Sequence, residues 1–267
     1  MYHYPNMLEE LKGAHQKAWG IVMRLLMLLG PFAAYGVLLV FFWFVYPPQD
    51  GALFSFSPQY LVLLGLLFVY MVPPFGKETI IPVALIGGEG LINLIATVTG
   101  VVLDSSDITG FPLWVLVLGI VGMDIAWAAF ITLNFNLLLK IPGIGRWLRW
   151  IMRGADKIIN SKPWIKNLSS TGLLLFMYIP FQGSGAITSS VIARLLNYPP
   201  LFAIGLVTFG SLLSTLSIGL GLSSILTLWE VHPLYGILMA AGLLGLIVLF
   251  AFSWGKIMSK LQNKSHE

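Results

Sequence analysis

The chain has 267 residues, of which 57% are hydrophobic and only 10% are charged, and its mean hydropathy is +0.87. Soluble domains carry roughly a quarter of their residues as charged ones, so this composition excludes an ordinary soluble domain and indicates an integral membrane protein. The absence of cysteine excludes disulfides and thiolate metal sites. At about 20 apolar residues per crossing, the length leaves room for several spans in a single transmembrane domain, residues 1–267.

The first expected elements are a short interfacial helix and a spanning helix. Residues 7–19 place apolar and charged side chains on opposite faces at helical spacing. Residues 1–23 are therefore predicted to lie along the membrane surface, with a frayed tail as the alternative. Residues 24–46 are long enough to span, whereas residues 59–72, which precede Pro73-Pro74, are short for a crossing.

Two later segments, 77–104 and 171–196, each contain a proline followed by a glycine-rich run. The breaks are Pro82 and Gly87 to Gly90 in the first segment, and Pro180 and Gly183 to Gly185 in the second. An unpaired backbone group costs several kcal/mol in hydrocarbon, so such breaks are tolerated only beside protein or a water-filled cavity. Each segment is predicted to be a re-entrant hairpin whose glycine-rich tip stops near the bilayer midplane. Two ordinary spans with proline kinks are the alternative.

We therefore predict an all-α, polytopic integral membrane protein with two re-entrant helical hairpins in an inverted-repeat-like arrangement. Further spans are expected over 112–139, 199–228 and 232–255. The segment 140–170 is predicted to include an amphipathic cytoplasmic helix, because apolar side chains alternate there with arginines at helical spacing. The apolar stripe of this helix consists of Trp147, Ile151 and Ile158.

Basic residues gather in one loop, which predicts the orientation in the membrane. Seven of the fifteen Lys and Arg residues are Lys140, Arg146, Arg149, Arg153, Lys157, Lys162 and Lys166. Such a cluster is typical of a cytoplasmic loop that faces anionic headgroups. We expect a multi-pass protein of the cell membrane with the 140–166 loop and the C-terminus cytoplasmic. The side of the N-terminus stays open, because an inverted first hairpin would put Lys12, Lys17 and Arg24 outside.

Three acids are candidates for ion coupling, because a carboxylate near the bilayer centre is costly unless it is paired, hydrated or protonated. Asp124 falls at the middle of its span however the ends are drawn, Glu89 lies at the first glycine-rich tip, and Glu78 lies at the start of that segment. The alternatives are a structural hydrogen bond for Asp124, a headgroup-facing position for Glu89 and an interfacial ion pair with Lys77 for Glu78.

Paired interrupted segments predict a transport site, because half-helix N-termini offer unpaired N–H groups to an anion. The residues expected to bind substrate are Pro82, Gly87, Gly88, Pro180, Gln182, Gly183, Ser184, Gly185, Thr188 and Arg194. Arg194 could capture a phosphate or carboxylate, or it could snorkel to the membrane surface. The sequence shows no metal-ligand cluster, phosphate loop or nucleophile with a base, so we expect no cofactor, no metal and no enzymatic activity.

These motifs resemble the DedA (SNARE-associated, VTT-domain) superfamily, and more closely its relatives called small multidrug export proteins. Glu78-Thr-Ile-Ile-Pro82 followed by Gly87-Gly88-Glu89 is similar to the first DedA hairpin, and GMDIAW around Asp124 looks like the family's Gly-Asp followed by an aromatic residue. Residues 179–196 are similar to the small-multidrug-export pattern of two prolines, Gly-Thr-Gly-Ala and a small-residue helix. The resemblance covers about residues 70–208. DedA proteins usually place arginines around the second hairpin's proline, and this chain lacks them there.

The resemblance implies facing re-entrant hairpins and the movement of a polyprenyl phosphate or a phospholipid between leaflets, with coupling to protons or sodium left open. Export of small molecules is an alternative, and a non-transporting membrane scaffold or assembly factor is another. Membrane lipids are the expected partners, with anionic headgroups at the 140–166 loop. Homo-oligomerisation is left open, and no nucleic acid is expected.

Overall fold

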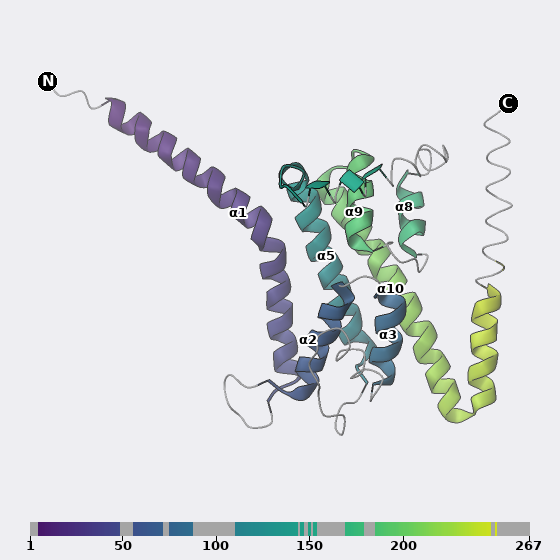
Figure 1. Ribbon diagram of the computed structural model, residues 1–267. Coiled ribbons are helices and arrows are strands. Elements are labelled where there is room, and N and C mark those ends of the chain that lie inside the picture. The colour runs from purple at the N-terminus through teal and green to yellow at the C-terminus, as the bar shows by residue number, and fades with distance from the viewer. Residues whose placement is uncertain are drawn as a thin grey trace, which may run out of the picture.

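The computed structural model describes residues 5–48, 56–71, 75–87, 110–143, 145–146, 149–150, 152–153, 169–178, 185–246 and 249. All regular secondary structure within these ranges is helical (Figure 1), which confirms the all-α prediction. The helices are α1 (Pro5–Val45), α2 (Pro58–Met71), α3 (Lys77–Ile86), α5 (Leu113–Leu138), α8 (Ser169–Tyr178), α9 (Ala186–Leu195) and α10 (Pro200–Val231), followed by Pro233–Leu246.

Three helical stretches are long and apolar enough to cross a membrane: Val22–Val45, Leu113–Leu138 and Pro200–Val231. This agrees with the polytopic membrane protein expected from composition. The first stretch is part of α1, a continuous helix of 41 residues, so the segment predicted as a separate interfacial helix continues into the span. Pro31 lies inside α1, which bends along its length in Figure 1. A proline removes one helical hydrogen bond and favours such a bend.

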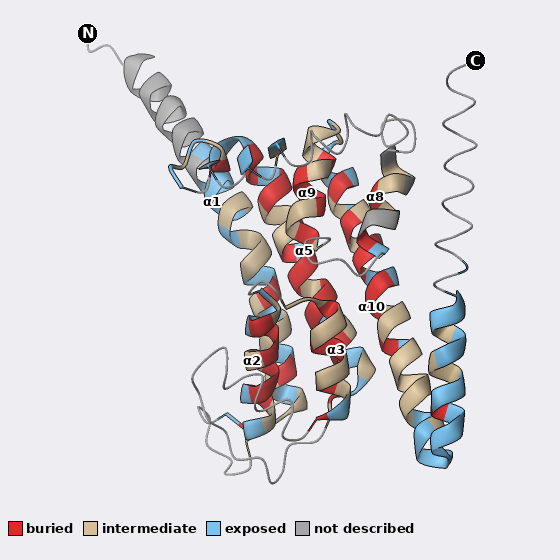
Figure 2. Cartoon of the chain, turned by 45° about the vertical axis from the view of Figure 1, so that its right-hand side comes forward, coloured by how far each residue is buried: buried red, intermediate tan, exposed pale blue. Residues whose placement is uncertain are grey.

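The central helix of the bundle is α5, against which α1, α2, α3, α9 and α10 all pack. In α5, 67% of the most apolar stretch is buried, against 11% in the corresponding stretch of α1, and Figure 2 shows the same contrast. Large apolar side chains such as Val37, Phe44 and Leu220 are exposed on the outer helices. Outward-facing apolar surface of this extent fits a lipid environment rather than water.

The helices α2 and α3 have 14 and 10 residues, or about 21 Å and 15 Å, and each is shorter than the hydrocarbon core of about 30 Å. Just before α2, Ser57 Oγ donates to the carbonyl of Tyr46 at 2.9 Å, and the Tyr46 ring packs on Phe111, which precedes α5. Near the end of α3, the carbonyl of Ala84 accepts a hydrogen bond from the Phe111 N–H at 2.8 Å. The start of α2 and the end of α3 therefore lie together at the start of α5.

The direction of α3 corrects one detail of the predicted first hairpin. The turn towards the centre of the bundle was expected at Gly87 to Gly90, but Gly87 follows the end of α3 that bonds to Phe111. It is Lys77, the first residue of α3, that lies beside Asp124, midway along α5. The start of α3, rather than its Gly87 end, therefore faces the centre of the bundle. Residues 72–74, which include Pro73-Pro74, lie outside the described residues.

The helices α8 and α9, of 10 residues each, form a second antiparallel pair. Leu173, in the first half of α8, packs with Ala193 near the end of α9, while Met177 packs with Ala186 at the start of α9 and with Ala128 of α5. The α8–α9 pair approaches the middle of α5 from one end of the bundle and the α2–α3 pair approaches it from the other (Figure 1). Residues 179–184, between α8 and α9, lie outside the described residues.

The basic loop is described only in short pieces. Arg149 Nη1 donates to the Leu139 carbonyl at 3.0 Å, which fastens the loop to the end of α5, and Arg153 Nε donates to the Arg149 carbonyl at 3.3 Å. The side chain of Trp150 is exposed. The predicted apolar stripe of Trp147, Ile151 and Ile158 lies outside the described residues, so the amphipathic helix stays a prediction.

Candidate functional site

A buried ion pair joins α3 to the centre of α5. Lys77 Nζ lies 2.9 Å from Asp124 Oδ2, and the two side chains are only 10% and 3% exposed. Each charge compensates the other, which reduces the cost of holding either of them away from water. Removing one partner would leave an uncompensated charge in the core of the bundle.

Both carboxylate oxygens of Asp124 accept further hydrogen bonds from neighbouring helices. The Tyr70 hydroxyl, near the end of α2, donates to Oδ1 at 2.7 Å. Ser211 Oγ, on α10, donates to Oδ2 at 2.5 Å. Hydrogen bonds to an ionised group are stronger than those between neutral groups. Asp124 therefore connects α2, α3 and α10 to α5 at one point.

The Lys77 ammonium is surrounded by oxygen atoms. It donates to Ser211 Oγ at 2.9 Å and to Ser214 Oγ at 3.1 Å, and the Ser211 carbonyl oxygen lies at 3.4 Å. A hydroxyl can donate one hydrogen bond and accept others, so Ser211 Oγ can accept from Lys77 while it donates to Asp124. The two serines are three residues apart and so share one face of α10.

Glycines on α5 let its neighbours come close enough to form this site. A methyl group at Gly119 would lie 2.9 Å from Leu67 Cδ2 of α2, and one at Gly122 would lie 2.7 Å from Leu38 Cδ2 of α1. Small residues permit this close approach between membrane helices. The approach of α2 at this level brings Tyr70 within reach of Asp124.

The alternative of an interfacial Lys77–Glu78 ion pair is not what the structure shows, because Lys77 pairs with Asp124. Among the described residues, the acid within ion-pair distance of Lys77 is Asp124. Glu78 lies in the first turn of α3, where the helix dipole favours a negative charge, and its carboxylate folds back over Gly76. Because α3 begins at the centre of the bundle, Glu78 lies near the level of Asp124.

The other predicted site residues fall into three groups. Pro82 is half-buried within α3, and Gly87 is the C-cap of that helix, with a φ of 70° that favours glycine. Gly185 is the N-cap of α9, and Thr188 is half-buried in the same helix. The residues that lie outside the described part of the chain are Gly88, Glu89, Pro180, Gln182, Gly183 and Ser184.

Arg194 lies in the last turn of α9, at the end remote from Gly185. Its side chain is half-buried, its Nη1 donates to the Tyr198 carbonyl at 3.0 Å, and its guanidinium carbon lies 5.7 Å from the centre of the Phe135 ring. Its Nε and the Tyr198 hydroxyl are buried and have no hydrogen-bond partner among the residues that the structure describes. Arg194 is thus a separate cationic position and is not part of the Asp124 cluster.

Sequence reasoning missed four members of the central cluster: Tyr70, Lys77, Ser211 and Ser214. Lys77 carried a usable signal, because it is a cation between two apolar runs and closely follows Pro73-Pro74. Ser211 and Ser214 follow Gly210 in an otherwise apolar helix, a pattern that also occurs at plain helix-packing surfaces. Tyr70 carried no distinguishing signal.

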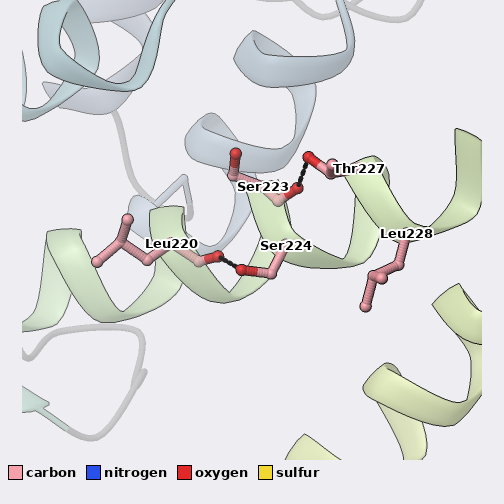
Figure 3. A pocket seen from close by; sticks show the side chains of 5 residues that line it. All are labelled: Leu220, Ser223, Ser224, Thr227 and Leu228. Carbon is pink, nitrogen blue, oxygen red and sulfur yellow. Dashed lines mark hydrogen bonds between the residues drawn. The ribbon is translucent and has the colours of Figure 1, made fainter.

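A shallow pocket lies elsewhere, along the second half of α10 (Figure 3). Its volume is 310 Å³, and its lining is Leu220, Ser223, Ser224, Thr227 and Leu228. Ser224 Oγ donates to the Leu220 carbonyl at 2.8 Å, and Thr227 Oγ1 donates to the Ser223 carbonyl at 2.9 Å (Figure 3). These donors are already used within the helix. No charged side chain is therefore among the residues that line this pocket, and the hydroxyl donors of Ser224 and Thr227 are both occupied.

Residues 108–218 match the family model described as "Putative small multi-drug export protein". The matched stretch includes Asp124 of α5, Arg194 of α9 and both serines of α10, whereas Tyr70 and Lys77 precede it. Over these residues the chain is similar to that family. No curated protein and no solved structure matches the chain. The wider resemblance to the DedA superfamily stays a prediction.

Proposed function

We propose that this protein is a membrane transporter that exports small amphipathic molecules along a path at the centre of its helix bundle. The observation that carries the proposal is the buried Lys77–Asp124 pair midway along α5. Ionisable groups inside a membrane are costly and occur mainly along the pathways of ions and substrates. The similarity of residues 108–218 to the small multi-drug export family also supports a role in export.

The two pairs of short helices also support transport. Helices of this length cannot cross the hydrocarbon core alone, and the backbone between them needs protein or water as a hydrogen-bonding partner. We propose that α2–α3 and α8–α9 are re-entrant hairpins related as an inverted repeat. Transporters with such repeats hold substrate near the midplane, where the repeats meet.

In this proposal Asp124 is the coupling acid. During the transport cycle it would exchange Lys77 for a proton or for a cationic substrate, and this exchange would release α3 from α5 and α10 together. A local change in pairing would thereby become a movement of packed helices. Glu78 and Glu89 are the further acids proposed to take part, from the first turn of α3 and from the segment that follows that helix.

The test is efflux of a cationic dye from proteoliposomes under an imposed pH gradient. We expect transport by the wild type and loss of most of it in Asp124→Asn. Ser224→Ala is the matched control, because Ser224 lies in the shallow pocket and its hydroxyl donates to the Leu220 carbonyl of its own helix. The folded amount of each variant is checked by size-exclusion chromatography. Unchanged efflux in folded Asp124→Asn would rule out the coupling role.

Arg194 favours a second candidate, an anionic lipid-linked substrate such as a polyprenyl phosphate or a phospholipid. Among the described residues no acid lies within ion-pair distance of this arginine, and its Nε has no partner. Guanidinium groups suit phosphate oxygens. If this candidate is right, the same proteoliposomes should move a polyprenyl phosphate between leaflets in an Arg194-dependent way and should leave the cationic dye inside.

The proposed location is the cell membrane, with the 140–166 loop and the C-terminus on the cytoplasmic side. Arg146, Arg149 and Arg153 are exposed and so could contact anionic headgroups. A scaffold function would depend on these arginines and would tolerate Asp124→Asn, which is the reverse of what the transport proposal expects.

A further inference from the structure

The oxygen atoms around the Lys77 ammonium have the composition of a cation site. They are a carboxylate oxygen of Asp124, the hydroxyl oxygens of Ser211 and Ser214, and the Ser211 carbonyl oxygen, all within 3.4 Å of Nζ. Oxygen ligands of these kinds are the ones that hard cations prefer. A single carboxylate among them also matches the charge of a monovalent ion.

The ligands and the cation come from different parts of the fold. Asp124 belongs to α5 and the serines to α10, two long helices that pack along each other. Ser211 Oγ also bonds to Asp124 Oδ2 directly, and Ser214 Oγ donates to the Ser211 carbonyl at 3.1 Å. The cage is therefore held by contacts that do not include Lys77, which reaches it from the short helix α3.

We propose that Asp124, Ser211 and Ser214 form a monovalent-cation site whose resident cation is the Lys77 ammonium. Because this cation is tethered to the chain, its effective concentration at the site is high, and dissolved sodium or potassium does not displace it. The wild-type protein consequently neither binds these ions at the site nor needs them. The cation site is inferred from geometry alone. If the protein is the transporter proposed above, the occupied site also implies that sodium is not the coupling ion, and only this consequence rests on the proposed function.

The proposal makes a specific claim about Lys77→Ala. That change removes the ammonium and most of its stem, and it leaves the Asp124 carboxylate buried beside an empty space. A dissolved alkali ion of the same charge can then occupy the cage. A ligand that binds only the folded state raises its stability with concentration, so the variant should become dependent on sodium or potassium.

The experiment is thermal unfolding of the full-length protein in detergent, in choline, sodium and potassium chloride at equal ionic strength. For Lys77→Ala we expect a saturable rise in Tm, on the order of 5 °C, in sodium or potassium relative to choline. The wild type and Lys77→Ala/Asp124→Asn should unfold at the same temperature in all three salts. Lys77→Gln is the matched control, because it lacks the charge but still fills the space.

Two results would overturn the proposal. One is a Lys77→Ala protein whose Tm in both alkali chlorides equals that in choline, and the other is an equal alkali effect in the wild type. If Lys77→Ala does not survive purification in choline, its monodisperse yield is compared among the three salts. Recovery in an alkali chloride supports the site, and equal loss in all three counts against it. None of these outcomes depends on transport, so failure of the cation site and failure of the proposed function are distinguishable.

Discussion

The centre of the bundle and the far end of α9 hold their cations in opposite ways. At the centre, Lys77 and both oxygens of Asp124 have partners from several helices. At the end of α9, the Nε of Arg194 and the hydroxyl of Tyr198 are buried and have no partner within the described part of the chain. A buried donor without a partner costs about 1–3 kcal/mol. The first region thus loses stability when a partner is removed, whereas the second has donors that a ligand could satisfy.

The largest expected effect comes from separating the two charges at the centre. Asp124→Leu or Lys77→Met alone should lower the free energy of unfolding by about 3–5 kcal/mol, because each leaves an unpaired buried charge. The double variant should recover at least half of that loss, because two apolar side chains of similar size need no counter-charge. Equilibrium unfolding in detergent measures all three variants. Additive losses in the double variant would show that the pair is not coupled.

A steric change should come next in size. A methyl group at Gly110 would lie 2.1 Å from the Leu85 carbonyl oxygen, a backbone atom that cannot rotate away. Gly110→Ala should therefore push α3 from the start of α5 and cost about 3 kcal/mol. Gly205→Ala is the control, because nothing lies within 4 Å of its added methyl group. Equal stability of the two variants would mean that this junction is not tightly packed.

Two tyrosines sharpen the comparison at the level of a single hydroxyl group. Tyr70→Phe removes the donor to Asp124 and should cost about 2 kcal/mol, since bonds to charged groups contribute about 1.5–3 kcal/mol. Tyr198→Phe removes a hydroxyl that has no partner among the described residues, so it should be neutral or stabilising. Unfolding of both variants measures the difference. A larger loss for Tyr198→Phe would reverse the assignment of the two regions.

A small loss of stability is expected at Arg194. Its side chain is half-buried and makes one hydrogen bond and one ring contact, so Arg194→Gln should cost about 1 kcal/mol or less. Thermal unfolding checks this value. A loss of stability as large as that of Asp124→Leu would mean that the Arg194 side chain is part of the structural core and that its donors are not available to a ligand.

Asp124 could be found from the sequence for a simple reason. It lies 12 residues after Pro112 and 16 before Lys140, so it falls near the middle of any helix drawn between them. The buried position of Asp124 and the long spans follow from the length and apolarity of the segments. The two short helices that flank residues 179–184 are instead indicated by Pro180 and the glycine-rich run.

Lys77 could not be placed in the same way. Its depth depends on which end of α3 faces the centre, and that is decided by contacts with Ser211 and Ser214, 134 and 137 residues away in the chain. The glycine run that begins at Gly87 gave a stronger local signal for a turn than Pro73-Pro74 did, and it drew the prediction to the wrong end of α3. The local sequence pattern identifies where a helix breaks, but the depth of that break in the bundle is set by tertiary packing.

The most direct test of the central claim is dye efflux by the folded double variant Lys77→Met/Asp124→Leu in proteoliposomes. This variant keeps an uncharged, filled centre, so its transport rate separates a working ion pair from a structural one. We expect a folded protein that recovers at least half of the stability lost in either single variant and that transports at the background rate. Efflux at the wild-type rate from the same folded protein would contradict the account.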